Sequence, residues 1–200
     1  MLILGLTGNI GCGKTSISSI FKKNNIDIID ADIISREIFE DQCLLEKVFE
    51  HFGPSVKNDD QTLNRKALGK IVFNDNNKLL ELNNLTHPKI KEKILCKIDE
   101  IKKKKKKVAV IDAALLVEGG YLEIVDKLLV VTCKQEVQIK RIQHRDNCTI
   151  DEAIRKIRSQ MPQDEKSRYA DYIIDNSGTI DELTKIVLKF IDYMKENWCG

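Results

Sequence analysis

Five short apolar runs stand out along an otherwise mixed chain. They occupy residues 2–6, 26–29, 108–111, 128–131 and, less strongly, 172–174. A nearly continuous apolar run suits a strand that is buried on both faces of a parallel sheet. Helical patterns separate the runs, so strands and helices alternate along the chain. This alternation predicts an α/β fold with a parallel five-stranded sheet flanked by helices.

Two apolar stripes at helical spacing predict helices that pack on this sheet. The first stripe is Ile17, Ile20 and Phe21. The second consists of Ile180, Leu183, Val187, Phe190, Met194 and Trp198. Two capping boxes mark predicted helix starts, Thr149 with Glu152 and Thr179 with Glu182. The long terminal stripe fits core packing, with a partner-docking surface as the alternative.

The stretch from about residue 35 to 107 contains no convincing strand. Its helical segments are predicted to break at Gly53-Pro54 and His87-Pro88. We therefore expect a helical lobe inserted between two strands of a single domain. Such a lobe is the expected place for a second substrate. The remaining core should comprise residues of about 1–34, 108–133 and 170–200.

Length and charge narrow the class of protein. With 200 residues, 42% of them hydrophobic, the chain can bury one substantial core. Its 33 basic and 31 acidic side chains leave a net charge of +2, so no global field marks a nucleic-acid binder. Six lysines at residues 102–107 end a helical pattern before a buried run. They fit a solvated helix terminus that the dipole favours, with a nucleic-acid or membrane patch as the alternative.

The cysteines and the first residues predict a cytoplasmic protein. The six cysteines include no CxxC pair, which favours reduced, structural thiols. The opening apolar run reaches Gly5 and Gly8 too soon for a signal peptide or a membrane span. We therefore expect neither a membrane nor a nucleic acid as a partner.

The strongest motif lies at residues 8–15, which read Gly-Asn-Ile-Gly-Cys-Gly-Lys-Thr between a predicted strand and a predicted helix. This is a GxxxxGK[ST] P-loop, in which glycines let consecutive amides point at phosphate oxygens and the helix N-terminus adds positive potential. Lys14 should reach the β- and γ-phosphates, and Thr15 should offer its hydroxyl to Mg²⁺. The predicted ATP site comprises Gly8, Gly11, Cys12, Gly13, Lys14, Thr15 and Ser16.

Aspartates end two of the predicted strands. Asp112 follows four apolar residues, as in a Walker B element that supports Mg²⁺, although a turn would also use an aspartate there. Asp30 and Asp32 end the second strand at the edge where ligands of parallel sheets bind. Asp32, with Arg36 one turn on, is either the base that takes a proton from an acceptor hydroxyl or a helix N-cap.

Gln138, Arg141 and Arg145 share one face of a predicted helix. The arginines could clamp a phosphoryl group bidentately, or the face could simply be solvated. The chain lacks the Asn-Lys-x-Asp motif of GTPase switches and the His-Arg-Asp and Asp-Phe-Gly motifs of protein kinases. A small-molecule kinase is the class that remains.

Taken together, these motifs resemble the dephospho-coenzyme A kinase family over nearly the whole chain. The shared pattern comprises, in order, residues 5–8 with the P-loop, 29–32 with Arg36, His87-Pro88, residues 115–118, Gln138 with Arg141, Arg145 and Asp146, Gln160, and residues 170–176. It implies a P-loop kinase fold in which residues of about 134–169 form a small mobile lid that carries Arg141 and Arg145.

The resemblance also implies the reaction: transfer of the ATP γ-phosphoryl group to the ribose 3′-hydroxyl of dephospho-coenzyme A, the last step of coenzyme A biosynthesis, with Mg²⁺. Catalysis would fall to Asp32 as the base, with Lys14 and Arg141, and Arg145 would contact ATP. The implied acceptor-binding residues are Thr7, Asp32, Arg36, His87, Lys91, Leu116, Glu118 and Arg141. The enzyme would act as a monomer or a weak homo-oligomer.

Two other functions fit parts of the pattern. Another small-molecule P-loop kinase, acting on a nucleoside monophosphate or a sugar acid, would share Lys14, Thr15 and Asp112. A nucleotide-gated binding protein would use the lysine run on RNA or anionic lipid.

Three positions depart from the family pattern: Asn9 replaces a glycine, Cys12 a serine and Ala114 a proline. Asparagine tolerates left-handed backbone, so Asn9 is compatible with the loop. Ala114 removes a backbone restraint beside the acceptor site. Cys12 stands at a helix N-terminus, a place that lowers thiol pKa, which leads to the hypothesis of a reactive thiol.

Overall fold

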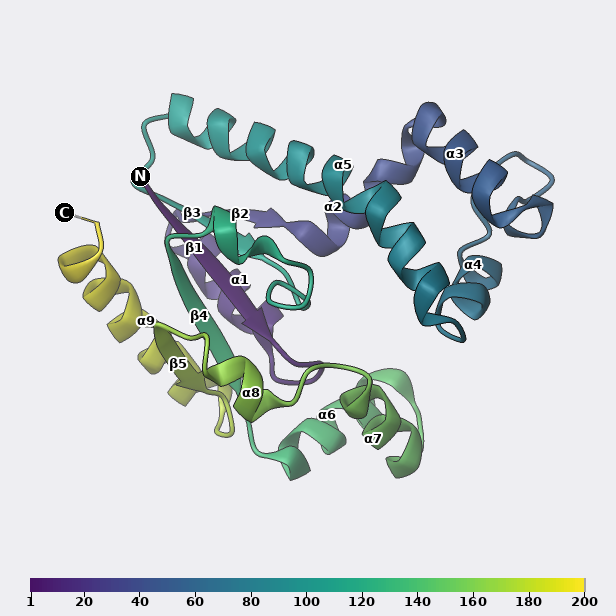
Figure 1. The fold of residues 1–200 in the computed structure, drawn as a ribbon. Coiled ribbons are helices and arrows are strands. Elements are labelled where there is room, and N and C mark those ends of the chain that lie inside the picture. Colours follow the sequence, from purple (N-terminus) through teal and green to yellow (C-terminus); the bar gives the residue numbers. More distant parts are fainter. Residues whose placement is uncertain (200) are drawn as a thin grey trace. The chain divides into compact units, whose positions relative to one another are not determined.

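A computed structural model describes residues 1–199 and contains a five-stranded parallel sheet with strand order β2-β3-β1-β4-β5 (Figure 1). The strands are β1 (Leu2–Gly8), β2 (Asp27–Asp30), β3 (Val108–Asp112), β4 (Lys127–Thr132) and β5 (Tyr172–Asp175). Every pairing in this sheet is parallel. The sheet and its flanking helices confirm the predicted fold class, and each apolar run forms a strand at nearly the expected residues.

The helices occupy the intervals between and after the strands. They are α1 (Lys14–Lys23), α2 (Ala31–Glu37), α3 (Gln42–Phe52), α4 (Arg65–Val72), α5 (Asn76–Lys103), α6 (Gln135–Asp146), α7 (Ile150–Arg158), α8 (Gln163–Ser167) and α9 (Ile180–Asn197), with short 3₁₀ turns at Ile38–Glu40, Pro54–Val56 and Tyr121–Ile124. The chain forms two compact units. The first combines Met1–Asp30 with the chain from Lys97 onward, and the second is Ala31–Cys96.

The core of the first unit explains why its strand runs are continuously apolar. Leu4 and Leu6 of β1 belong to a buried cluster with residues of α1 and α9. Gly5 faces the other way, where an added Cβ would lie 2.9 Å from Leu128 and 3.0 Å from Leu116. Both faces of β1 are therefore covered, and neither tolerates a polar side chain.

The last helix confirms most of the predicted stripe. Leu183, Val187, Phe190 and Met194 of α9 are buried against the sheet, whereas Ile180, in the first turn, is 59% exposed. Both predicted capping boxes are present, at the starts of α7 and α9. In the second of these, the Glu182 carboxylate accepts from the Thr179 N–H at 2.7 Å.

The predicted break at His87-Pro88 is wrong, because α5 continues through Pro88 from Asn76 to Lys103. A proline inside a helix costs about 3 kcal/mol. Burial of an isoleucine side chain gains roughly 1.5–3 kcal/mol. The helix buries a stripe of four such residues, Ile90, Ile94, Ile98 and Ile101. Packing therefore outweighs the local penalty, whereas the break at Gly53-Pro54 is confirmed by the end of α3 at Phe52.

Residues 1–199 include no helix with the length and apolar content that crossing a bilayer requires.

Candidate active site

The carboxyl ends of the parallel strands gather chemical groups at one edge of the first unit. Leu6 of β1 pairs with Asp112, the last residue of β3, and β1 then leads into the glycine-rich loop. On the other side, Gly8 pairs with Val131, and Thr132 pairs with Asp175 at the end of β5. Parallel sheets bind ligands at this edge, so the structure brings the P-loop and Asp112 together there.

Two loop glycines are required by backbone conformation and by space. Gly11 and Gly13 have φ angles of +81° and +89°, in the left-handed region. A Cβ on Gly13 would lie 2.1 Å from the Asn176 amide nitrogen, and one on Gly11 would lie 2.9 Å from Ile142. Any other residue at either position would be strained and would displace a neighbour.

Side-chain amides hold the loop backbone in place. Gln138 donates to the Ile10 carbonyl at 2.7 Å, and Gln160 accepts from the Ile10 N–H at 2.8 Å. Asn176 donates to the Cys12 carbonyl at 2.7 Å. These contacts satisfy backbone groups inside the loop and restrain its shape. The amide positions appear in the sequence pattern, but their partners lie too far along the chain to be inferred from spacing.

Asn9 fits the loop by a route other than the expected one. Among residues 1–199, the non-glycine positions with positive φ are Asn25, Gln61, Lys105 and Asn147, so Asn9 does not use the left-handed region. Its side chain is buried and donates to the Met161 carbonyl at 2.8 Å. Asn9 therefore ties the loop to the segment between α7 and α8.

Lys14 and Asp112 form an ion pair at the base of the loop. Asp112 is 4% exposed, and its second carboxylate oxygen accepts from the Ser18 hydroxyl. Both carboxylate oxygens are thus engaged by residues of α1. Ser18 was not singled out by the sequence pattern. Its position one turn after Lys14, on the same face of the helix, is the signal that could have identified it.

The oxygen ligands here suit a hard divalent cation. Mg²⁺ prefers carboxylate and hydroxyl oxygens, and it usually keeps waters and substrate phosphates in its shell. Asp112, at the end of β3, supplies a carboxylate. The exposed Thr15, in the first turn of α1 after the loop, supplies a hydroxyl. Within residues 1–199 no group of three or more His, Cys, Asp or Glu side chains could hold a metal by itself. The Asp112 carboxylate and the Thr15 hydroxyl are of the ligand type that such a cation takes.

Arg141 brings a second cationic group to the loop. Its Nη1 atom lies 3.7 Å from the position of a Cβ on Gly13. This atom is buried and has no hydrogen-bond partner within residues 1–199. A buried guanidinium nitrogen without a partner is unfavourable, and an anion at the loop would satisfy it.

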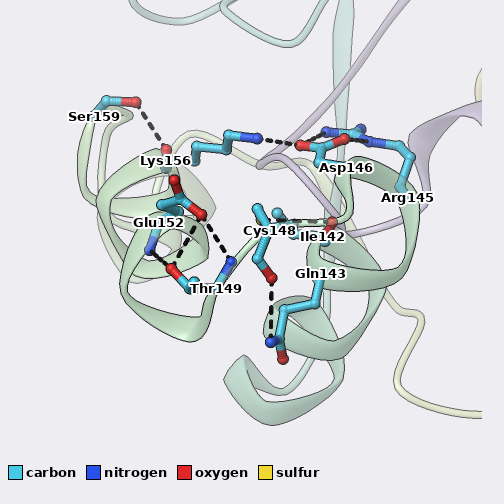
Figure 2. Close-up of polar contacts among 9 residues, drawn as sticks. All are labelled: Ile142, Gln143, Arg145, Asp146, Cys148, Thr149, Glu152, Lys156 and Ser159. Carbon is cyan, nitrogen blue, oxygen red and sulfur yellow. Dashed lines mark hydrogen bonds and ion pairs between the residues drawn. The ribbon is translucent and has the colours of Figure 1, made fainter.

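Arg145, one turn further along α6, lies in a different environment. Its Nε atom lies 2.6 Å from Oδ1 of Asp146. Figure 2 shows this ion pair and the Lys156 side chain of α7, which contacts the same carboxylate. Hydrogen bonds from Arg145 and then Lys156 hold the pKa of Asp146 far below its ordinary value. The two arginines thus share a helix face but have different surroundings. Arg141 lies at the loop, and Arg145 lies in an exposed ion cluster that joins α6 to α7.

The segment after β3 carries three further residues of interest. Thr7 is buried, and its hydroxyl donates to the Ala114 carbonyl at 3.1 Å. Leu116 is buried against the sheet, whereas the Glu118 side chain is 23% exposed and pairs with Lys166 at 3.0 Å. Lys166 was not identified from sequence, because a lysine among charged residues gives no sign that it is buried.

The second unit carries the remaining predicted residues. Asp32 and Arg36 are exposed on α2, and the Arg36 carbonyl accepts from Arg65 at 2.9 Å. The helix begins at Ala31, so Asp32 lies within its first turn and is not an N-cap. His87 and Lys91 are half-buried, one turn apart on α5. Burial lowers the pKa of His87, which favours its neutral form.

The hypothesis of a reactive Cys12 is wrong. Cys12 is fully buried, and its sulfur lies 3.4 Å from that of Cys133. The hydrogen bond with Cys133, followed by burial, raises the pKa of the Cys12 thiol far above its ordinary value. These effects outweigh the helix N-terminus, so Cys12 packs as a small apolar residue.

A parallel sheet with a P-loop, its lysine beside a strand-end aspartate and an arginine at the loop define a P-loop phosphotransferase. Comparison with known proteins narrows this class. Residues 2–182 match the family model described as dephospho-CoA kinase. The chain therefore belongs to the dephospho-CoA kinase family and is a kinase.

Individual relatives agree with this assignment. The chain is 41% identical to a Lactobacillus johnsonii dephospho-CoA kinase, with 96% of each chain covered. It is 39% identical to the enzyme of that name from Carboxydothermus hydrogenoformans, over 98% of this chain and 96% of the relative. Among solved structures, the Campylobacter jejuni dephospho-CoA kinase superposes with a TM-score of 0.74 at 31% identity, covering 97% of each chain.

Proposed function

We propose that this kinase transfers the γ-phosphoryl group of ATP to the ribose 3′-hydroxyl of dephospho-coenzyme A, giving coenzyme A and ADP. The single observation that carries the proposal is the pairing of Lys14 with Asp112 at the base of a P-loop, in a chain of this family. The reaction is the last step of coenzyme A biosynthesis. All six cysteines are free thiols, which supports a reducing, cytoplasmic setting.

The donor half of the reaction is assigned to the first unit. Backbone amides of residues 11–16 would bind the phosphates, and Lys14 would leave Asp112 to contact the β- and γ-phosphates. The unpartnered Nη1 of Arg141 supports a role on the transferring group. We also assign Arg145 to the nucleotide side. It would contact ATP in place of Asp146, its present partner.

Mg²⁺ would be held by Thr15 and Asp112, the latter through water. When bound with nucleotide, the ion neutralises charge as the phosphoryl group moves. Ser18 holds one Asp112 oxygen, so the carboxylate keeps its orientation when Lys14 turns toward phosphate. Phosphate oxygens complete the shell of such an ion, which is consistent with the small number of protein ligands.

The acceptor half is assigned to the residues that the family pattern implies. We propose Asp32 as the general base, since it is an exposed carboxylate in the first turn of its helix. Arg36, His87 and Lys91 would bind acceptor phosphate or ribose. Glu118 would contact the acceptor from the segment after β3, where the buried Thr7 and Leu116 shape the backbone.

The region from about residue 134 to 169 is proposed as a lid. It contains α6 to α8 and carries Arg141, so the closed lid would hold the arginine on bound nucleotide and exclude water. The Asp146 cluster that joins α6 to α7 supports movement of these two helices as one body.

The experiment is ADP release with Mg²⁺-ATP and a panel of acceptors: dephospho-coenzyme A, AMP, adenosine, CMP and gluconate. Turnover restricted to dephospho-coenzyme A is the expected result. Faster turnover of a nucleoside monophosphate or gluconate would show that this compound, and not dephospho-coenzyme A, is the acceptor. The Lys14→Met variant should be inactive with every acceptor and controls for contaminating kinases.

A further inference from the structure

Lys166 is a buried lysine that the reaction described above does not use. It lies on α8 and is 0% exposed. Its ammonium nitrogen donates to the Ala114 carbonyl at 2.9 Å and pairs with a Glu118 oxygen at 3.0 Å. Burying a lysine is expensive unless its charge is paired and its hydrogen bonds are satisfied. Here Glu118 pairs the charge and the Ala114 carbonyl accepts a hydrogen bond, and both belong to one short segment.

That segment, residues 113–118, follows directly from β3 and Asp112. The Ala114 carbonyl is held by two donors: Lys166 from α8, and the Thr7 hydroxyl from β1 at 3.1 Å. Glu118 is held by Lys166 and also accepts from the Met161 N–H at 3.3 Å. The backbone at Ala114 and the side chain at Glu118 are therefore fixed together by one ammonium group.

Direct action of Lys166 on a substrate is ruled out by its burial, since no part of the residue is accessible. Its influence must pass through its partners. Glu118 is 23% exposed and therefore accessible from solvent, whereas the Ala114 carbonyl lies in the backbone between Asp112 and Glu118. Position 114 is an alanine, so its φ angle lacks the restraint that a proline would supply. The two hydrogen bonds to its carbonyl supply a restraint instead.

We propose that Lys166 is a positioning residue for the acceptor: it holds residues 113–118 in the conformation that binds dephospho-coenzyme A and orients the Glu118 carboxylate toward it. The inference rests on the proposed function. It adds a residue of α8 that does not itself contact a substrate. It also links the lid region to the acceptor side, because α8 belongs to residues 134–169.

The test compares Lys166→Met with Lys127→Met. Methionine keeps most of the apolar stem of lysine and removes both polar contacts. Lys127 is the control for loss of an ion pair, because it pairs with Asp171 at 2.8 Å but is 39% exposed and stands at the opposite end of β4 from the loop. Steady-state constants for both substrates are measured well below the unfolding temperature, with urea unfolding recorded for each variant.

In Lys166→Met, kcat/KM for dephospho-coenzyme A should fall about 10- to 100-fold, the range expected for a misplaced binding group. KM for ATP should stay within about twofold of wild type, since the loop contacts are untouched. Lys127→Met should leave both values unchanged. A stability loss with unaltered constants for both substrates would overturn the proposal, because it would show a structural role alone.

Lys166→Gln guards against an unstable methionine variant. Glutamine retains one donor for the Ala114 carbonyl and loses the charge opposite Glu118, so a smaller shift in the same constant is expected. Failure of both variants to fold would assign Lys166 to the fold and refute a positioning role. Absence of wild-type turnover with dephospho-coenzyme A would instead refute the proposed function, so the two failures are distinguishable.

Discussion

The ammonium group of Lys14 pairs with the carboxylate of Asp112, which joins the P-loop to the end of β3. The two opposite charges neutralise each other at an edge where both side chains are largely buried. The ion pair also keeps the Lys14 ammonium group next to the place where nucleotide phosphates would bind. Binding of Mg²⁺-ATP would exchange one partner of each group, the lysine gaining phosphate and the aspartate gaining hydrated metal.

Asp112→Asn should weaken the response to Mg²⁺. The amide still accepts from Ser18 but loses the charge that supports the cation. We expect the half-saturating Mg²⁺ concentration to rise about tenfold and kcat to fall. Titration of activity with Mg²⁺ at saturating ATP measures the effect. Asp192→Asn, on the exposed face of α9, is the control. An unchanged Mg²⁺ titration for Asp112→Asn would remove Asp112 from the metal site.

Asp32→Asn should lose most turnover and keep ATP affinity. The amide preserves the shape and a hydrogen bond but cannot accept the proton, a role worth about 10²- to 10⁴-fold in rate. Stopped-flow kcat together with ATP binding by calorimetry gives the two quantities. Asp59→Asn changes an exposed aspartate in the same unit and should behave as wild type. A rate within a few-fold of wild type for Asp32→Asn would rule out the base.

Arg141 and Arg145 should differ although they share a helix face. Arg141→Met removes a buried, unpartnered donor beside Gly13, and kcat should fall about 10²- to 10³-fold. Arg145→Met removes a side chain that is 59% exposed and already bonded to Asp146, so its effect should be smaller. Equal losses in parallel kcat measurements would show that the pair acts as one clamp.

Cys12 should react slowly with iodoacetamide. Its thiol is buried and its raised pKa suppresses the thiolate, the reactive form. Cys43 and Cys96 are exposed and should be alkylated first. Timed labelling followed by peptide mass spectrometry resolves the three sites. Labelling of Cys12 as fast as Cys43 would contradict the packing described for it.

Local patterns predicted those parts of the molecule whose cause is local. Continuous apolar runs identified the strands, because burial on both faces leaves no polar position. The P-loop was recognisable because its chemistry depends on glycines and one lysine at fixed spacing. The capping boxes likewise involve residues three positions apart.

Features that depend on tertiary packing could not be predicted from local sequence patterns. Pro88 lies inside α5, a helix whose isoleucine stripe is buried by tertiary packing. The burial of Lys166 depends on partners 48 and 52 positions earlier in the chain, Glu118 and Ala114. Cys12 contacts Cys133, which lies 121 positions later in the chain, and that contact reverses the expected direction of the Cys12 pKa shift. In each case a long-range contact outweighs a local tendency.

The most direct test of the central claim is to locate the transferred phosphate. Dephospho-coenzyme A is incubated with Mg²⁺-ATP and the enzyme, and the product is examined by ³¹P NMR and mass spectrometry, with Lys14→Met as the blank. A single new phosphate on the ribose 3′-oxygen, formed together with an equal amount of ADP, is the expected result. Phosphate at another oxygen, or ADP formed without a phosphorylated acceptor, would contradict the proposed reaction.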